Sequence, residues 1–368
     1  MASLLRRLAP LAPRKSSVSM ATGRCCFGNT AFAPSKGAGA APIQLHTEWI
    51  APTASKDEND TGGGGAREQD GHYTMLFLHG LLGSGRNLRS FARKVVRQES
   101  SAGGSLCHGG ILVDLRGHGS TFREQQRREK DGSACDDAST FGDCARDIEH
   151  TLRGGSTPKH PAEAPPARVL VGHSFGGRVA LEYAAGLADT EPLGALWLLD
   201  TVPGEANESV DRVLATITKV LGDANRGGNQ KVPTKKEIVS VLTGPPHGMD
   251  LPTAQWLAMS YDEESGDNFG FDNDLVTRLK PEFERQDFLG LLRGVLRAER
   301  PGTGAASRTQ VHVVRGGKNR GWTVPILSEL EKVRKEFPAN FHLHVLPSAG
   351  HNVHIDDTEG LVRLFAGR

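Results

Sequence analysis

Short apolar runs alternate with amphipathic segments along most of the chain. The runs are rich in Val, Leu and Ile, and they are typical of strands buried on both faces of a sheet. We expect strands over residues 45–50, 73–78, 110–115, 168–171, 195–199, 311–315 and 341–346. Between several of these runs, apolar residues recur at intervals of three and four, which predicts helices. The expected helices span residues 87–98, 141–152, 174–187, 324–337 and 358–365.

This alternation predicts an α/β fold with a mostly parallel central sheet flanked by helices. Residues 204–300 interrupt it, because they carry helical patterns and no convincing strand. Open α/β sheets bind ligands at the carboxyl ends of their strands, so we expect this segment to form a helical lid there. The core is then divided into a first part, residues 44–203, and a last part, residues 301–368.

Three polar insertions lie within the first part of the core. Residues 51–72 contain four consecutive glycines and predict a flexible linker. Residues 121–138 are highly charged and predict an exposed loop or helix, and residues 153–167 form a proline-rich loop. These insertions affect the geometry of the connecting loops and not the candidate catalytic residues identified below.

The amino-terminal segment differs in composition from the rest. Residues 1–47 contain no Asp or Glu, although they include Arg6, Arg7 and Arg14 and several serines. This composition is typical of an organelle transit peptide, which we place at residues 1–43. Leucines at helical spacing beside Arg6 and Arg7 favour mitochondrial import, whereas residues 31–34 resemble a plastid processing site. A disordered tail without a targeting role is the remaining alternative.

Composition excludes several classes of function. The chain has 44 basic and 43 acidic residues in 368, a formal net charge of +1, which gives no electrostatic reason to expect nucleic acid or an anionic membrane as a partner. No apolar stretch is long enough to predict a transmembrane helix. The five cysteines are scattered and form no pair at the spacing of a zinc site. We expect no metal and no organic cofactor.

A candidate nucleophile lies where a strand passes into a helix. Gly172-His173-Ser174-Phe175-Gly176 follows the apolar run 168–171 and precedes a helical segment. In this context the motif predicts a sharp strand-to-helix turn that exposes the serine hydroxyl above the sheet. The alternative is a glycine-rich turn in which Ser174 only caps the helix.

An oxyanion hole needs two backbone N–H groups near that serine. The residue after the nucleophile, Phe175, is expected to supply one of them. The loop His79-Gly80-Leu81-Leu82 follows an earlier strand, and its Leu81 is expected to supply the other. His79 then orients the loop and is not a base. A phosphate-binding loop at residues 80–85 is rejected, because its glycine spacing is wrong and no Gly-Lys-Ser/Thr follows.

The general base and its acid are expected after later strands. His351 follows the strand that ends at residue 346, where the base of a Ser–acid–His order belongs. The loop at residues 316–321 contains no Asp or Glu, so by elimination the acid is Asp200, at the end of the strand after the nucleophile helix. The alternative for Asp200 is an Asx turn into the following residues.

Two other clusters have weaker claims to chemistry. A metal site built from histidines of residues 342–354 and Asp356 lacks any standard metalloenzyme spacing. The segment Asp114-Leu115-Arg116-Gly117-His118-Gly119-Ser120 follows a strand, and it is expected to be a tight turn in which Asp114 and Arg116 hold neighbouring loops.

Taken together, the motifs resemble a known family. They are HGLLGS at 79–84, DLRGHGS at 114–120, GHSFGGR at 172–178, Asp200 and GHNVH at 350–354. The combination resembles the α/β-hydrolase fold superfamily, and within it the alpha/beta hydrolase domain-containing protein 11 group and the YbfF-type bacterial esterases. The resemblance covers about residues 44–368 and is weak in the lid. It implies hydrolysis of esters or lipid esters, with mitochondrial or plastid members, and it agrees with Asp200 as the acid.

These observations predict a serine hydrolase that cleaves small acyl or lipid esters through Ser174, Asp200 and His351 and an acyl-enzyme. A thioesterase or a cofactor-free haloperoxidase would use the same three residues. A hydrolase-fold binding protein without turnover is the alternative from another class. Protein partners are not indicated by the sequence.

Substrate choice is expected to depend on the lid. Its Trp256, Phe269 and Phe271 are candidates for lining an acyl pocket. The same apolar residues would also be needed simply to pack the lid helices, and for any single one packing is the favoured interpretation.

Overall fold

A computed structural model describes residues 40–52, 72–101, 107–131, 140–154, 166–187, 193–204, 208–225, 232–263, 269–299 and 308–367. The expected transit peptide lies almost wholly outside these residues, as do most of the linker at 51–72 and most of the proline-rich insertion. Among the helices of the described part, none has the length and apolar character that crossing a membrane requires.

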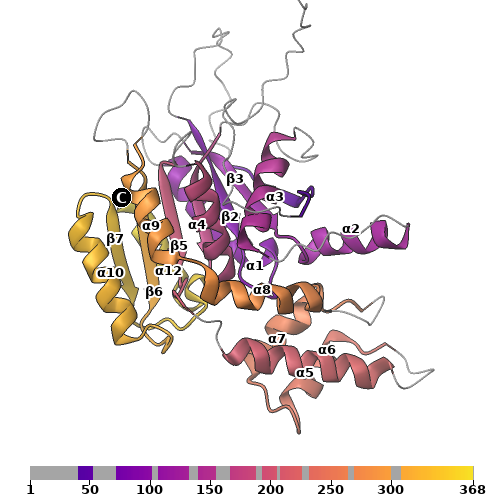
Figure 1. Ribbon diagram of the computed structural model, residues 1–368. Helices are drawn as coiled ribbons and strands as arrows, with labels where there is room; N and C mark the ends of the chain where they lie inside the picture. The colour runs from indigo at the N-terminus through magenta and orange to yellow at the C-terminus, as the bar shows by residue number, and fades with distance from the viewer. Residues whose placement is uncertain are drawn as a thin grey trace, which may run out of the picture.

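Within the described residues, seven strands form one sheet in the order β1-β3-β2-β4-β5-β6-β7 (Figure 1). They are β1 (His46–Ile50), β2 (Tyr73–Leu78), β3 (Cys107–Asp114), β4 (Ala167–His173), β5 (Ala195–Leu199), β6 (Gln310–Gly316) and β7 (Phe341–Leu346). The edge strand β1 pairs antiparallel with β3, and every other pair of neighbours is parallel. The expected α/β architecture with a mostly parallel sheet is confirmed.

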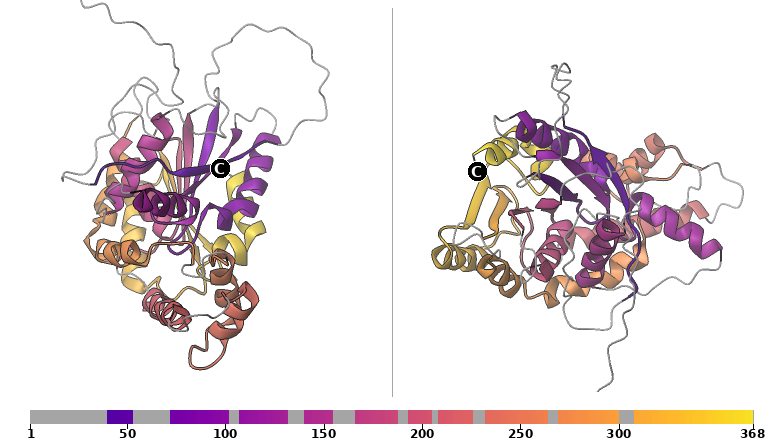
Figure 2. Two further views of the ribbon diagram at one scale, coloured as in Figure 1. Left: turned by 90° about the vertical axis from the view of Figure 1, so that its right-hand side faces the viewer. Right: turned by 90° about the horizontal axis from the view of Figure 1, so that it is seen from above.

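Helices cover both faces of the sheet, as the apolar runs predict (Figure 2). On one face lie α1 (Gly85–Ser101), α11 (Val353–Asp356) and α12 (Thr358–Ala366). The other face carries α3 (Phe141–Arg153), α4 (Phe175–Leu187), α9 (Phe288–Arg297) and α10 (Val324–Glu336). Strand β5 shows the alternation clearly, because Trp197 and Leu199 point into the first layer and Leu196 and Leu198 into the second.

The charged insertion and the expected lid are both helical where they are described. Helix α2 (Gly119–Lys130) occupies much of the segment 121–138. Helices α5 (Glu208–Asn225), α6 (Lys235–Thr243), α7 (Leu251–Ser260) and α8 (Asn273–Arg285) lie beyond the carboxyl ends of the strands (Figure 1, Figure 2). Helix α9 also falls inside residues 204–300, but it packs against α4 of the core. The segment predicted as lid therefore divides between α5–α8 and one core helix.

Most helices of the inserted segment begin with local capping. Thr234 and Glu237 form a reciprocal capping box at α6, and Asp250, Asp272 and Asp287 accept backbone N–H groups at α7, α8 and α9. Such caps satisfy the free N–H groups at a helix start from within the same few residues. These helix starts are therefore determined locally by the sequence.

One buried guanidinium joins the two ends of this segment to the core. Arg178 of α4 donates to the carbonyl oxygens of Val202 and Gly204, where the chain leaves the sheet. It also donates to Phe283 O and Gln286 Oε1, both at 3.2 Å, where the chain returns. Burial lowers the pKa of Arg178 to about 10, which leaves it charged at neutral pH.

Candidate active site

Ser174 lies at a strained turn between β4 and α4. Its φ angle is +51°, in the left-handed region that side chains other than glycine rarely adopt. A Cβ atom at Gly176 would lie 2.4 Å from His79 O, so only glycine permits this approach of the turn to the loop after β2. The surrounding packing maintains this strained backbone conformation. Such strain is common at functional sites, where it directs a side chain toward a ligand.

The structure brings His351 and Asp200 together. His351 Nδ1 lies 2.7 Å from Asp200 Oδ2, although the two residues are 151 positions apart. Asp200 is completely buried, whereas the His351 side chain is 45 % exposed. Since a carboxylate can only accept, Nδ1 carries the proton and Nε2 is left as an acceptor.

The Asp200 carboxylate is surrounded by donors. Its Oδ1 accepts from Gly316 N and Trp322 Nε1, both at 2.7 Å, and its Oδ2 accepts from the Asn319 side chain as well as from His351. Burial alone would raise the pKa of Asp200, but the hydrogen bond and charge of His351 and the other donors lower it below its ordinary value. The carboxylate is therefore held ionised.

Asn319 and Trp322 are site residues that sequence reasoning missed. In the sequence, the loop at 316–321 is distinguished only by its lack of an acid, yet this loop and the adjoining Trp322 supply three of the four donors to Asp200. The signal available was a loop after a late strand that contains amide and indole donors but no carboxylate. This loop also lies against the one that carries His351, because a Cβ atom at Gly316 would lie 1.9 Å from Gly350 O.

A second buried histidine connects the two halves of the site. His173 directly precedes Ser174, and its Nε2 lies 3.0 Å from His351 O. Because a carbonyl oxygen only accepts, Nε2 of His173 carries the proton. Burial, with the nearby charge of His351, lowers the pKa of His173 to about 3, so the ring is neutral at physiological pH. This bond places the loop of His351 directly against the turn that carries Ser174.

In the described part of the chain, no hydrogen bond joins the Ser174 hydroxyl to His351. Such bonds are often long before a substrate is bound and shorten in the reacting complex. Two other contacts determine where Ser174 and His351 lie. His173 links the turn of Ser174 to the loop of His351, and Asp200 fixes the ring of His351.

The loop after β2 is held by two neutral histidines. His79 Nδ1 donates to Gly80 O at 2.8 Å, and its Nε2 accepts from Leu115 N at 3.0 Å. The Nε2 atom of His118 accepts from Leu82 N at 3.3 Å, and its Nδ1 donates to Arg116 O at 2.8 Å. Burial lowers the pKa of His79 to about 4 and that of His118 to about 3. His79 thus orients the loop, as its position in the sequence suggested.

The two expected oxyanion donors border the serine. A Cβ atom at Gly80 would lie 3.5 Å from Ser174 Cβ, so the loop with Leu81 runs beside the nucleophile. Among the described residues, none accepts the Leu81 N–H, whereas the next N–H, of Leu82, is engaged by His118. Phe175 has a fully buried ring, stacked on His118 at 5.7 Å, and its N–H lies at the start of α4.

The segment at 114–120 is a structural turn, in agreement with the preferred interpretation. Asp114 accepts from Gly85 N and Ser120 N, both at 2.7 Å, and so joins the starts of α1 and α2. Arg116 forms a buried ion pair with Asp147 of α3 at 2.6 Å. These contacts connect neighbouring elements.

The three lid residues proposed for substrate binding lie in packed surroundings. Phe269 and Phe271 are almost fully buried, Phe269 beside Tyr261 and Phe271 beside His118. Trp256 is half-buried and packs against the main core. Contact with a substrate stays a prediction for all three.

Among the residues that the structure describes, no group of three or more His, Cys, Asp or Glu side chains could hold a metal ion.

A seven-stranded, mostly parallel sheet, a strained Ser174 after β4 and a His–Asp pair on later loops define a hydrolase-type α/β fold. The model of the alpha/beta hydrolase family matches residues 75–364, and the chain belongs to this family. It is accordingly a hydrolase of the α/β class. A search among curated proteins finds no match.

Solved structures of the same fold are distant in sequence. An esterase from a marine microorganism is 16 % identical, with a TM-score of 0.56, over 88 % of this chain and 99 % of that one. E-2-(acetamidomethylene)succinate hydrolase is 17 % identical, with a TM-score of 0.54, over 89 % and 97 %. The peroxisomal α/β-hydrolase Lpx1 of Saccharomyces cerevisiae is 14 % identical, with a TM-score of 0.52, over 88 % of each chain. At these identities the likeness concerns the fold alone.

Proposed function

We propose that the chain is a serine esterase that cleaves carboxylic esters of small acyl or lipid substrates. The observation that carries the proposal is the 2.7 Å contact between His351 Nδ1 and the buried Asp200, which lie after β7 and β5 respectively. A histidine fixed in this tautomer presents Nε2 as a base. A buried carboxylate with four donors is suited to stabilise the imidazolium that forms during acyl transfer.

In the proposed reaction, His351 Nε2 takes the Ser174 hydroxyl proton as Oγ attacks the acyl carbonyl. The tetrahedral intermediate collapses, the bond to the alcohol oxygen breaks, and His351 returns the proton to the leaving alcohol. Water then gives a proton to His351 and attacks the acyl carbon. Collapse of the second intermediate releases the acid and restores the Ser174 hydroxyl.

The N–H groups of Phe175 and Leu81 are proposed to bind the oxyanion. Phe175 N–H lies at the amino end of α4, where the helix field favours negative charge. The Leu81 N–H lies on the loop that His79 and His118 hold. Both donors are set before substrate arrives, which is the condition under which such groups stabilise a transition state most.

Covalent labelling tests the proposal. The full chain, treated with a fluorophosphonate and read by intact mass, should gain one adduct, and Ser174→Ala should gain none. Ser90→Ala, at an exposed position of α1, is the matched control and should label like the parent chain. A folded parent chain that gains no adduct, or labelling that survives Ser174→Ala, would contradict the proposal and favour the binding-protein hypothesis.

The acyl substrate itself is tested by paired assays. An ester and a thioester of the same acid differ only in the leaving atom, so the same three residues serve both. Faster turnover of the ester supports an esterase, and faster turnover of the thioester supports a thioesterase. Halogenation of a reporter in the presence of bromide, hydrogen peroxide and a short carboxylic acid would identify the haloperoxidase alternative. The Ser174→Ala variant is the blank for all three assays.

We also propose that residues 1–43 direct import into mitochondria, with plastids as the alternative destination. The support is the absence of acidic residues before Glu48 and the leucine–arginine pattern at the start of the chain. A fluorescent protein carrying residues 1–43, expressed in cells that contain both organelles, tests the destination. Diffuse fluorescence would indicate the disordered tail.

A further inference from the structure

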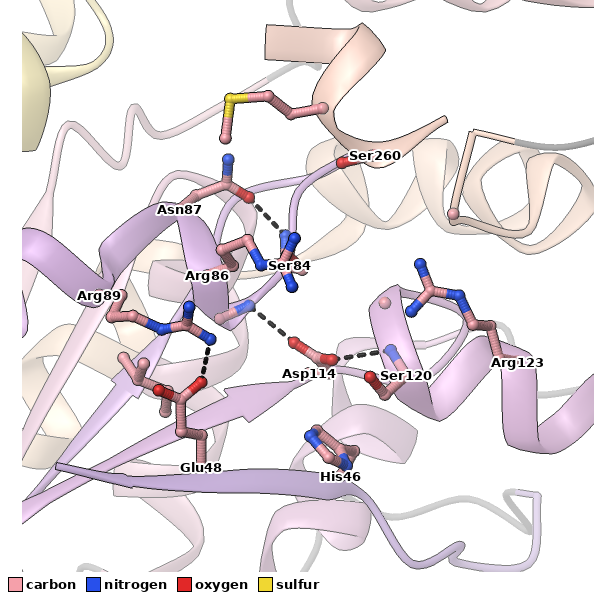
Figure 3. A pocket seen from close by; sticks show the side chains of 15 residues that line it. His46, Glu48, Ser84, Arg86, Asn87, Arg89, Asp114, Ser120, Arg123 and Ser260 are labelled. Atoms are coloured by element: carbon pink, nitrogen blue, oxygen red, sulfur yellow. Dashed lines mark hydrogen bonds and ion pairs between the residues drawn. The ribbon is translucent and has the colours of Figure 1, made fainter. Parts of the chain in front are cut away.

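A polar cleft lies apart from the three proposed catalytic residues, between the core and the inserted helices. It encloses about 130 Å³, and neither Ser174, Asp200 nor His351 lines it. Its floor is formed by β1, β3 and the starts of α1 and α2, and its roof by the end of α7, where Ser260 lies (Figure 3). Gly270 also lines the cleft. A ligand in this cleft would touch both the core and the inserted segment.

Three arginines surround the cleft. Arg89 pairs with Glu48, but Arg86 and Arg123 make no hydrogen bond or ion pair with any described residue. They approach from different helices, α1 and α2. Figure 3 shows the guanidinium of Arg123 directed toward the start of α2, on the side of the cleft opposite Arg86. The cleft thus has, on facing walls, two cations that have no partner in the described part of the chain.

The carboxylates of the cleft do not neutralise these cations. Asp114 has each of its two oxygens engaged by a backbone N–H, of Gly85 and of Ser120. Glu48 is bound by Arg89. Within the described surroundings, Arg89 Nε is buried without an acceptor, which adds an unsatisfied donor to the same cleft. Three guanidinium groups face two carboxylates that already have partners.

Neutral donors complete the lining. The hydroxyl groups of Ser84, Ser120 and Ser260 have no hydrogen-bond partner among the described residues. The oxygen of the Asn87 side chain accepts from Ser84 N at 2.6 Å, so its amide nitrogen is left as a donor. Arginine forks and hydroxyl groups together match the several acceptor oxygens of a tetrahedral oxyanion.

We propose that this cleft binds a phosphate group of a phosphate-bearing ligand. The facing Arg86 and Arg123 bind its charged oxygens, and the serine hydroxyls and the Asn87 amide bind the remaining ones. Ser260, at the end of α7, brings the inserted segment into the contact. Since both arginines are solvent-exposed, binding weakens as ionic strength rises. The ligand is either a soluble phosphorylated compound or the headgroup of a lipid.

The test uses the full chain and inorganic phosphate, titrated at low ionic strength and followed by ³¹P NMR linewidth. The double variant Arg86→Gln with Arg123→Gln should bind phosphate more weakly, with a dissociation constant raised by at least about tenfold. The matched control is Arg93→Gln with Arg127→Gln, on the same two helices but outside the cleft. Thermal unfolding of each variant verifies that it is folded.

A second experiment distinguishes a soluble phosphorylated ligand from a lipid headgroup. Glycerol 3-phosphate represents a soluble ligand, and phosphatidic acid in phosphatidylcholine vesicles represents a headgroup. Saturable binding of either probe that depends on the two cleft arginines supports the proposal and identifies the source. Equal losses in the cleft and control variants, or no saturable binding of any probe, overturn it. The Ser174→Ala variant should bind phosphate unchanged, so the result is independent of the proposed esterase activity.

Discussion

The surroundings of Asp200 in the core and the inserted helices α5–α8 differ in how many contacts fix each residue. Around Asp200 the polar groups are paired, and the loops approach so closely that a Cβ atom at Gly316 would overlap Gly350. The inserted helices instead begin with local caps and expose large apolar side chains, among them Val241, Leu251 and Met259. Both ends of the insertion meet the core at Arg178.

The difference indicates that the two regions have different requirements for precise positioning. Chemistry by a histidine and a carboxylate requires positions held within fractions of an ångström, which demands many contacts that determine each group. A covering segment needs only to be attached at its ends and can vary in its outer surface. Four predictions test this comparison, from the largest expected effect to the smallest.

Acid should act on the core through its buried histidines. Burial lowers the pKa of His79 to about 4 and that of His118 and His173 to about 3, whereas an unfolded histidine titrates near 6.5. The contribution of these neutral histidines to the free energy of unfolding is complete above pH 6.5. It is lost as the pH falls, because the unfolded chain then binds protons that the folded core does not. We expect a loss of roughly 1 kcal/mol per pH unit for each histidine.

Urea unfolding at pH 7, 6 and 5 measures this slope. His118→Gln should reduce this slope by about one quarter, because it removes one of four fully buried histidines with a lowered pKa and leaves His79, His173 and His354. A slope that is unchanged in this variant would show that the buried histidines do not control acid stability.

Removing the charge of the acid should disable the proposed chemistry without unfolding the core. Asp200→Asn leaves a side chain of the same size but no longer stabilises the imidazolium, so we expect kcat on an activated ester to fall on the order of 10³–10⁴-fold. Trp322→Phe removes only one donor from the carboxylate and should cost about tenfold. Equal activity of Asp200→Asn and the parent chain would remove Asp200 from the mechanism.

The attachment of the inserted segment should depend on one residue. Arg178→Met leaves four buried or half-buried oxygen acceptors without their donor, and we expect the free energy of unfolding to fall by about 3 kcal/mol. Limited proteolysis should then cut faster near residues 202–204. The control Arg212→Met, at an exposed position of α5, should change neither measurement.

The smallest effect is expected on the outer surface of α7. Leu251 is 53 % exposed, so Leu251→Ser should change the free energy of unfolding by less than about 0.5 kcal/mol. Leu257 on the same helix is fully buried, and Leu257→Ser should cost several times more. Chemical denaturation of both variants makes the comparison, and similar losses would show that the outer face is also packed.

Much of this arrangement could be predicted from residue patterns. All seven strands were expected close to their observed positions. For the five inner strands, the reason is an apolar run that is buried on both faces. Asp200 was predicted as the acid by elimination, from a loop without acids, and the structure places it 2.7 Å from His351. Asn319 and Trp322 could not be found in this way, because an amide or an indole in a loop has no distinctive pattern until the fold shows what it contacts.

The sequence by itself determined the alternating fold, the glycine-flanked turn at Ser174 and the capped helices of the insertion. Each of these depends on residues a few positions apart, whose conformational preferences act locally. Only the tertiary structure decided that His173 binds the backbone of His351, that Arg178 joins both ends of the insertion, and that Arg86 and Arg123 face each other across a cleft. These contacts join residues far apart along the chain, and such pairs meet only when the whole sheet and its connections have assembled.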